Sequence, residues 1–142
     1  MIYVKDIMAR RVKTIEAESS ITDAAKAMSK WKIGALVITQ GSSPVGIITE
    51  GDVSRSVAKG VTLGTKLRSF TKKKLITVGP GERVEVAAKK MAEGGVKKLP
   101  VMEDGKLVGM ITQTDIVNSS FALVTSLKEM VQARYRPPDF EM

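Results

Sequence analysis

The feature that most constrains this chain is an internal repeat: residues 11–53 align without a gap to residues 74–116, at a fixed offset of 63 positions. Eleven aligned positions are identical, where ordinary residue usage would give about three by chance. They are Thr14/Thr77, Ala24/Ala87, Ala25/Ala88, Lys26/Lys89, Met28/Met91, Leu36/Leu99, Val45/Val108, Gly46/Gly109, Ile48/Ile111, Thr49/Thr112 and Asp52/Asp115. The chain is therefore a duplication, and a site built by one copy has a counterpart in the other.

Both copies predict the same order of elements, which is strand, helix, strand, strand, helix. The helix of the first copy has apolar residues at helical spacing, and Ser20 with Asp23 forms a candidate capping box at its start. In each copy the second strand leads through a polar turn into the third, as in a β-hairpin. The expected segments are strands at 12–15 and 34–38 and a helix at 20–30 in the first copy, and strands at 75–78 and 98–102 in the second.

A unit of this size buries only a small core and is marginal alone, so the two copies are expected to pack together. We expect one compact α+β module, in which two βαββα units are related by a pseudo-twofold axis and residues 56–70 connect them. The expected boundaries are 1–60 for the first unit, 61–120 for the second, and 121–142 for a C-terminal helix and tail.

The segment 119–134 predicts a helix with an apolar stripe, and Pro137-Pro138 ends it. This helix either packs on the module or forms a contact between two copies of the chain. The apolar residues of the stripe are Phe121, Leu123, Val124, Leu127, Met130 and Val131.

Composition excludes several classes of function. The 142 residues contain no cysteine and no histidine, which excludes disulfides, thiol chemistry, Cys/His zinc sites and Ser-His-Asp catalysis. No apolar run approaches the roughly 18 residues that span a bilayer, and no signal-peptide pattern opens the chain, so we expect a cytoplasmic protein. The net charge of +8 fits either an anionic partner or a solvated basic surface.

In each copy a short apolar run, read as a buried strand, ends in Thr-x-x-Asp, and a helix is expected to follow. The first copy has Thr49 and Asp52, and the second has Thr112 and Asp115. A threonine and an aspartate in this position can cap the helix, whose first N–H groups need acceptors. They can also bind a ligand, because a carboxylate suits a cis-diol while a hydroxyl and free amides at a helix N-terminus suit phosphate.

Taken together, these motifs resemble a tandem pair of CBS (cystathionine-β-synthase) domains, also called a Bateman module. The resemblance covers about 1–120 and implies two βαββα units whose sheets pack to leave two symmetry-related clefts. In that family the clefts typically bind AMP, ADP or ATP, and sometimes S-adenosylmethionine or NAD. The motifs are Lys5-Asp6-Ile7-Met8, the helix with Ile21, Ala24, Ala25 and Met28, the strand Leu99-Pro100-Val101, and Gly-x-Ile-Thr-x-x-Asp at 46–52 and 109–115.

The resemblance assigns the ribose hydroxyls to Asp52 and Asp115 and the phosphate to Thr49 and Thr112. It further implies phosphate contacts by basic residues and an apolar slot for the base, although a basic surface and core packing explain the same residues. The phosphate candidates are Lys97 and Lys98, with Arg55 and Lys13 as weaker ones. The base-slot candidates are Val12, Ile33 and Ala35 in one cleft and Leu75, Ile76, Val96 and Pro100 in the other. Gly34 is a further candidate binding residue of the first cleft.

The two copies are not equivalent at their predicted clefts. Gly34, Gly51 and Arg55 of the first copy are replaced in the second by Lys97, Thr114 and Asn118. These exchanges change both the size and the charge of the clefts. One cleft is therefore expected to bind more tightly than the other, or to be the one that fills.

The leading hypothesis is a stand-alone regulatory module that senses adenosine nucleotides, with AMP as the first candidate and ADP or ATP next. It is expected to be a homodimer, to act on a partner protein that the sequence does not identify, and to lack enzymatic activity, a catalytic cofactor and a metal of its own. Mg²⁺ is expected only together with ATP, with Glu50 as a candidate ligand. The alternative is a basic module that binds nucleic acid or protein without sensing nucleotides.

Overall fold

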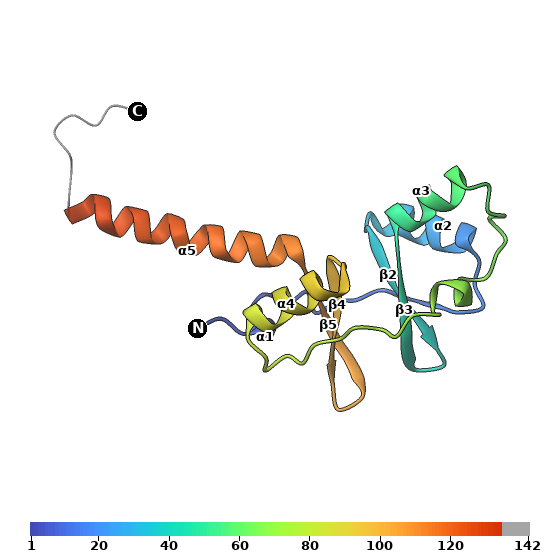
Figure 1. Ribbon diagram of the computed structural model, residues 1–142, viewed down its shortest axis with the longest axis horizontal. Helices are drawn as coiled ribbons and strands as arrows, with labels where there is room; N and C mark the ends of the chain where they lie inside the picture. Colours follow the sequence, from blue (N-terminus) through green and yellow to red (C-terminus); the bar gives the residue numbers. More distant parts are fainter. Residues whose placement is uncertain (135–142) are drawn as a thin grey trace.

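The computed structural model describes residues 1–134, without the side chains of 121–124, 126, 133 and 134. It is a mixed α+β fold with two sheets, as the sequence predicts (Figure 1). The elements are α1 (Val4–Ile7), β1 (Thr14–Glu16), α2 (Ile21–Trp31), β2 (Ala35–Gln40), β3 (Ser43–Thr49), α3 (Glu50–Ala58), the 3₁₀ helix η1 (Leu67–Phe70), α4 (Val84–Gly94), β4 (Lys98–Glu103), β5 (Lys106–Thr112) and α5 (Gln113–Arg134).

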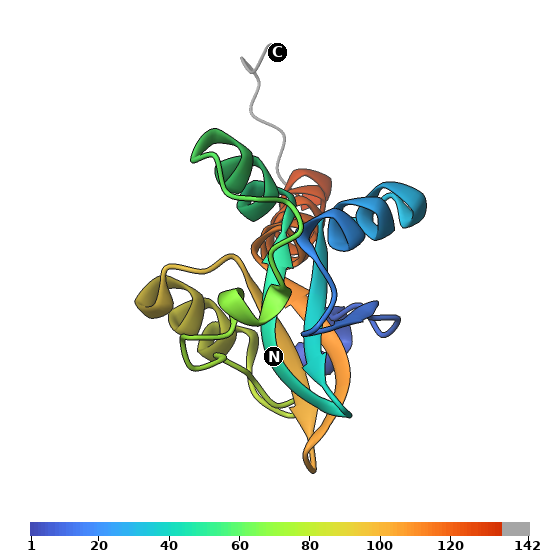
Figure 2. The same ribbon diagram turned by 90° about the vertical axis from the view of Figure 1, so that its right-hand side faces the viewer.

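Each copy contains one antiparallel hairpin, β2–β3 in the first and β4–β5 in the second. The turns of both hairpins point toward the same end of the molecule (Figures 1 and 2). In the first copy β1 adds a parallel strand, so that Ile15 lies opposite Ile38. In the second copy the equivalent residues, Val78 and Val101, form an isolated parallel bridge. The strand predicted at 75–78 is therefore reduced to one bridge.

Proline explains this difference between the copies. The N–H of Val37 in β2 donates to the carbonyl of Lys13 at 3.1 Å and so fixes the start of β1. The residue equivalent to Val37 is Pro100, which has no N–H to donate. The segment before Val78 consequently lacks that bond, and only the pairing around Val78 remains.

The helices after β1 and after the Val78 bridge match closely in their apolar faces and in their C-terminal ends, but only α2 has a side-chain cap at its start. The predicted capping box of α2 is confirmed, since Ser20 and Asp23 exchange hydrogen bonds of 2.9 and 3.0 Å. At their C-termini, α2 ends on Lys32 with φ 53° and α4 on Gly95 with φ 64°. The left-handed conformation suits glycine, whereas the lysine holds it with a steric penalty.

Two apolar clusters form the core, one around each hairpin. The first consists of Ala17, Ile21, Ala24, Met28, Leu36, Ile38, Ile48 and Leu67. The second consists of Val4, Met8, Val78, Ala87, Met91, Leu99, Val101 and Ile111. Each cluster therefore includes residues that lie, in the sequence, next to the other copy: Leu67 in the first cluster, and Val4 and Met8 in the second.

The exchanged residues come from α1 and η1, which lie 63 positions apart like the rest of the repeat. The N–H of Val4 donates to the carbonyl of Glu82 at 2.9 Å, and the N–H of Leu67 donates to that of Ser19 at 2.8 Å. Val4 and Leu67 are both fully buried. Such reciprocal contacts between equivalent positions are those of a twofold arrangement.

The repeat thus extends beyond the segment that sequence identity reveals. The prediction that residues 56–70 connect the two units is wrong in part. Instead α3 continues to Ala58, and η1 is built into the first core. Glu18 helps to hold this segment, because its carboxylate lies 2.6 Å from Nζ of Lys66. The hydrogen bond from Lys66 lowers the pKa of Glu18.

The helix α5 is longer than predicted, since the final helix of the second copy continues into the predicted C-terminal helix as one element. Its distal part extends away from the rest of the molecule (Figure 1). Leu127, Met130 and Val131 are 51%, 63% and 61% exposed, so these three residues do not pack on the module. The side chains of Phe121, Leu123 and Val124, and the tail with Arg136 and Pro137-Pro138, lie outside the described residues.

Candidate functional site

The predicted binding residues form two equivalent corners. We call Thr49 and Asp52 the first corner, between β3 and α3, and Thr112 and Asp115 the second corner, between β5 and α5. Both threonines stand at the end of a strand whose interior is buried. Both aspartates lie in the first turn of the following helix.

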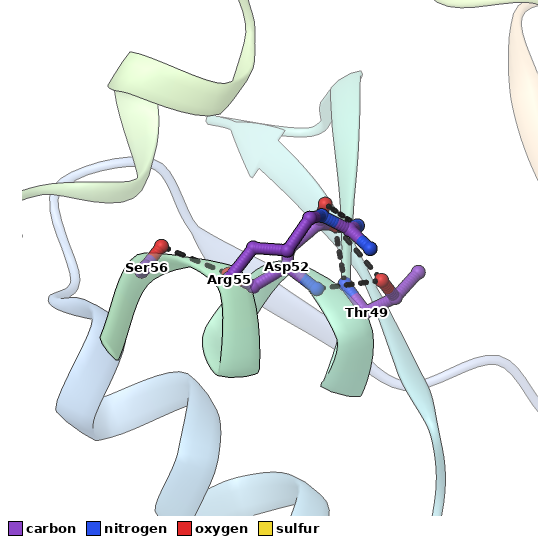
Figure 3. Close-up of polar contacts among 4 residues, drawn as sticks. All are labelled: Thr49, Asp52, Arg55 and Ser56. Atoms are coloured by element: carbon purple, nitrogen blue, oxygen red, sulfur yellow. Dashed lines mark hydrogen bonds and ion pairs between the residues drawn. The ribbon is translucent and has the colours of Figure 1, made fainter. Parts of the chain in front are cut away.

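The first corner is a closed set of short hydrogen bonds (Figure 3). Oδ2 of Asp52 accepts from the backbone N–H of Thr49 at 2.9 Å and from its hydroxyl at 3.0 Å. The N–H of Asp52 is 3.2 Å from Oγ1 of Thr49. Ser56, one turn on, donates its hydroxyl to the carbonyl of Asp52 at 2.8 Å. The corner is therefore rigid, with one carboxylate oxygen committed to the cap.

The second corner repeats this geometry. The N–H of Thr112 donates to Oδ2 of Asp115 at 2.9 Å, and the N–H of Asp115 donates to Oγ1 of Thr112 at 3.1 Å. As in the first corner, one oxygen of the carboxylate serves the helix.

Capping alone accounts for this geometry, as a third example shows. Ser20 and Asp23 make the same box at the start of α2 with the same distances to within 0.2 Å. There the hydrogen bond from the backbone N–H of Ser20 lowers the pKa of Asp23. The corners differ from that box in their surroundings, because each lies against the end of the neighbouring strand of its hairpin.

The structure brings four further predicted residues to the corners. In the first hairpin Ala35 pairs with Thr49, and the carbonyl of Gly34 accepts from the N–H of Glu50 at 3.0 Å. In the second hairpin Lys98 pairs with Thr112, and the carbonyl of Lys97 accepts from the N–H of Gln113 at 2.8 Å. The backbone contacts are equivalent, so the second corner gains two lysine side chains at positions where the first has Gly34 and Ala35.

Arg55 lies at the first corner and is engaged with it. Its Nη2 is 2.8 Å from Oδ1 of Asp52, the carboxylate oxygen that the cap does not use (Figure 3). The arginine side chain is 64% exposed and the aspartate side chain 25%. Residues three positions apart on a helix lie close together, so the sequence indicates this ion pair. The role predicted for Arg55, however, is a phosphate contact.

The residues predicted to line the slot for the base range from exposed to fully buried. Val12, Ile33, Ala35, Leu75 and Ile76 are half-buried, whereas Val96 is 37% exposed. Pro100 is fully buried. Ile33 packs on the first core and Ile76 on the second. Their assignment to a base slot stays a prediction.

One aromatic residue near the first corner was not predicted. Trp31, three positions before Gly34, lies under the ammonium group of Lys13, whose Nζ is 4.7 Å from the ring centroid. This contact engages Lys13, a predicted phosphate candidate. Trp31 is the one tryptophan of the chain and could have been noted for that reason, although the sequence does not place it beside Lys13. At the equivalent positions the second copy has Gly94 and Ile76.

Two cavities lie away from the corners. One of about 560 Å³ lies between the two hairpin turns, and Val12 is the one predicted site residue that lines it. The other, of about 770 Å³, is lined by η1 and its flanks, including Lys66, Arg68 and Lys72. Lys66 and Arg68 both pair with Glu18, which offsets part of their charge. The corner residues line neither cavity and are half-buried.

Within residues 1–134, no acidic side chains gather in a group that could hold a metal ion. No helix among the described residues is both long enough and apolar enough to cross a membrane.

Relatives of this chain include both whole proteins and parts of larger ones. It is 27% identical over 117 residues to the CBS domain-containing protein YhcV of Bacillus subtilis, covering 82% of this chain and 84% of YhcV. It is 35% identical over 116 residues to a homoserine O-acetyltransferase of Methanohalobium evestigatum, covering 80% of this chain. The chain spans 23% of the length of that enzyme, so the similarity concerns one part of it.

Among solved structures, the CBS domain pair of protein MJ0100 superposes with a TM-score of 0.77 at 29% identity, covering 86% of this chain and 98% of that one. That pair was crystallised in complex with 5′-methylthioadenosine and S-adenosyl-L-methionine. Comparison with known families matches residues 4–59 and 67–121 to the CBS domain. The chain therefore belongs to the CBS domain family and carries a tandem pair of these domains.

Proposed function

We propose that this CBS pair binds adenosine nucleotides at its two corners, with AMP as the first candidate and ADP or ATP next, and that it acts as a regulatory sensor. The observation that carries the proposal is the doubled Thr-Asp corner, in a fold that matches a CBS pair crystallised with two adenosyl compounds. We keep 1–60, 61–120 and 121–142 as the proposed division into two units and a C-terminal helix.

The chemistry of the corners supports this assignment. In each box the cap uses one carboxylate oxygen of the aspartate, and the other would accept a ribose hydroxyl; at the first corner that oxygen also pairs with Arg55. The positive dipole end of the helix suits a phosphate, and the threonine hydroxyls would donate to it, that of Thr49 by giving up its hydrogen bond to Asp52. At the second corner Lys97 and Lys98 flank Thr112 and add positive charge.

A regulatory role fits the residues better than catalysis. The corners hold a carboxylate and a hydroxyl that already serve as helix caps, so neither is free to act as a nucleophile activated by a base. Binding would instead act by favouring one arrangement of the two units. The regulated partner would be another protein or another domain.

Self-association is the second part of the proposal. Leu127, Met130 and Val131 are exposed on the distal part of α5, and a second copy of the chain would cover them. We infer a homodimer on this basis.

Calorimetric titration tests the binding proposal, with AMP, ATP, S-adenosylmethionine and NAD added separately to the protein. We expect binding of at least one of them, and weakening or loss in Asp52→Ala and Asp115→Ala. The nucleic-acid alternative predicts the opposite result, which is no heat with any adenosyl ligand and salt-sensitive binding to an oligonucleotide. Unchanged binding in both variants would also contradict the proposed site.

A further inference from the structure

We propose that Arg55 makes the first corner selective for phosphorylated adenosine ligands, whereas the second corner, with Asn118 in that position, lacks this selection. The inference rests on the proposed function, because it assumes that both corners bind the ribose. It goes further by naming the residue that would make the two sites different and the class of ligand that each would take.

The first step in the argument is the competition for Asp52. The cap uses Oδ2, and Nη2 of Arg55 lies 2.8 Å from Oδ1. A ribose hydroxyl that binds Oδ1 either shares that oxygen with the guanidinium or displaces it, and in both cases it weakens the ion pair. A ligand phosphate gives the guanidinium a second anionic partner with strong, charge-assisted hydrogen bonds. An unphosphorylated nucleoside weakens the ion pair and supplies no such partner.

The second step concerns the space that the arginine needs. Gly51 lies beneath the guanidinium, since a Cβ atom built on Gly51 would be 3.1 Å from Nη1 of Arg55. The second copy has Thr114 in place of Gly51 and Asn118 in place of Arg55. The copy with the arginine thus has a glycine where the guanidinium lies, and a Cβ atom there would make a tight contact that a small shift of the flexible arginine relieves.

The third step is the charge at the second corner. Lys97 and Lys98 come from the neighbouring strand and can assist a phosphate there, but Asn118 carries no charge with which to compete for Asp115. The second corner is thus expected to accept nucleosides as well as nucleotides, with any preference for a phosphate coming from the two lysines and not from competition for Asp115. The first corner is expected to reject the nucleoside.

Each corner can be measured alone by calorimetry. Asp115→Asn leaves the first corner as the binding site, and Asp52→Asn leaves the second. AMP and adenosine serve as the two probes. At the first corner we expect AMP to bind at least about tenfold more tightly than adenosine, the scale of a hydrogen bond to a charged group. Arg55→Asn should reduce this ratio several-fold, mainly by weakening AMP. Arg55→Lys, which keeps the charge, should retain part of it.

Asn118→Arg provides the matched control at the second corner, where it should raise the ratio of AMP affinity to adenosine affinity. If AMP binds and Arg55→Asn leaves the ratio at the first corner unchanged, this inference is wrong while the proposed function stands. If the wild-type protein binds none of AMP, ADP, ATP and adenosine, both are wrong. Circular dichroism of each variant verifies that the fold is intact, and a ratio lost equally in Arg55→Lys and Arg55→Asn would contradict the role of charge.

Discussion

At the scale of single residues, several equivalent positions of the two copies share a backbone conformation but carry different side chains, and the differences have physical consequences. Lys32 and Gly95 end equivalent helices in the same left-handed conformation. Arg55 and Asn118 stand at equivalent positions beside the two corners, but only the arginine carries a charge. Each copy therefore serves as the comparison for a substitution made at the equivalent position of the other.

Lys32→Gly is expected to stabilise the protein by about 1 kcal/mol, because glycine adopts the left-handed conformation without the clash of a Cβ atom. Gly95→Lys is the reverse change in the other copy and should destabilise by a similar amount. Urea unfolding followed by circular dichroism gives both free energies. A loss of stability in Lys32→Gly would show that the lysine side chain makes a contact that outweighs its backbone strain.

Much of the corner geometry was predictable from the residues themselves. Thr-x-x-Asp at the end of an apolar run predicts a capping box, and the box forms at both corners and at Ser20 and Asp23. The helical spacing of Arg55 and Asp52 also indicates their ion pair. The contact of Lys13 with Trp31 could not be predicted, because the two residues lie in different segments and local sequence does not determine their side-chain rotamers.

At the scale of elements, the structure is organised by the exchange of α1 and η1 between the two cores. Sequence identity between the copies begins at Thr14, so the repeat gave no sign that residues 4–7 and 67–70 are also equivalent. They are equivalent in their backbone hydrogen bonds and in their burial, both of which different apolar side chains can maintain. For the same reason residues 67–70 were predicted as connector although they belong to a core.

The exchanged segments pass close to a glycine in each hairpin. A Cβ atom on Gly109 would lie 2.7 Å from the carbonyl oxygen of Ala9, and one on Gly46 would lie 3.2 Å from that of Phe70. Since the first distance is a clash with backbone, the N-terminal segment would have to move. The second distance is tight but requires a smaller shift.

Gly109→Ala is therefore expected to destabilise the protein by about 1–3 kcal/mol, as overpacking does. Gly46→Ala should have a smaller effect. Gly64→Ala is the control, because no atom lies within 4 Å of its added Cβ, and it should change stability by less than about 0.5 kcal/mol. Urea unfolding of the three variants measures the order. Equal effects in Gly109→Ala and Gly64→Ala would contradict the close approach of the N-terminal segment.

At the scale of the whole molecule, the two domains form one α+β module from which the distal part of α5 extends (Figure 1). The general architecture was predictable because the duplication, the hairpins and the amphipathic helices all indicated the same fold. The continuous helix α5 could not be predicted. The sequence from 113 to 134 contains no helix-breaking residue, but nothing in it indicates that the two predicted helices form one element.

The proposed homodimer predicts a mass of two chains in size-exclusion chromatography with light scattering at micromolar concentration. Leu127→Lys combined with Met130→Lys should give a single chain, because both residues are exposed on α5 and would be charged within the interface. Leu63→Lys, an exposed apolar residue outside α5, is the control and should remain a dimer. A dimer that survives the double substitution would place the interface elsewhere.

The central claim is that the two corners bind adenosine nucleotides and do not serve only as helix caps. The most direct test is calorimetric titration of AMP into wild type, the double variant Asp52→Asn/Asp115→Asn, and Asp23→Asn. Asp23 belongs to a capping box of the same geometry on α2, so this control separates capping from binding. The account predicts that the double variant loses AMP binding while Asp23→Asn keeps the wild-type affinity. AMP binding that is unchanged in the double variant would contradict it.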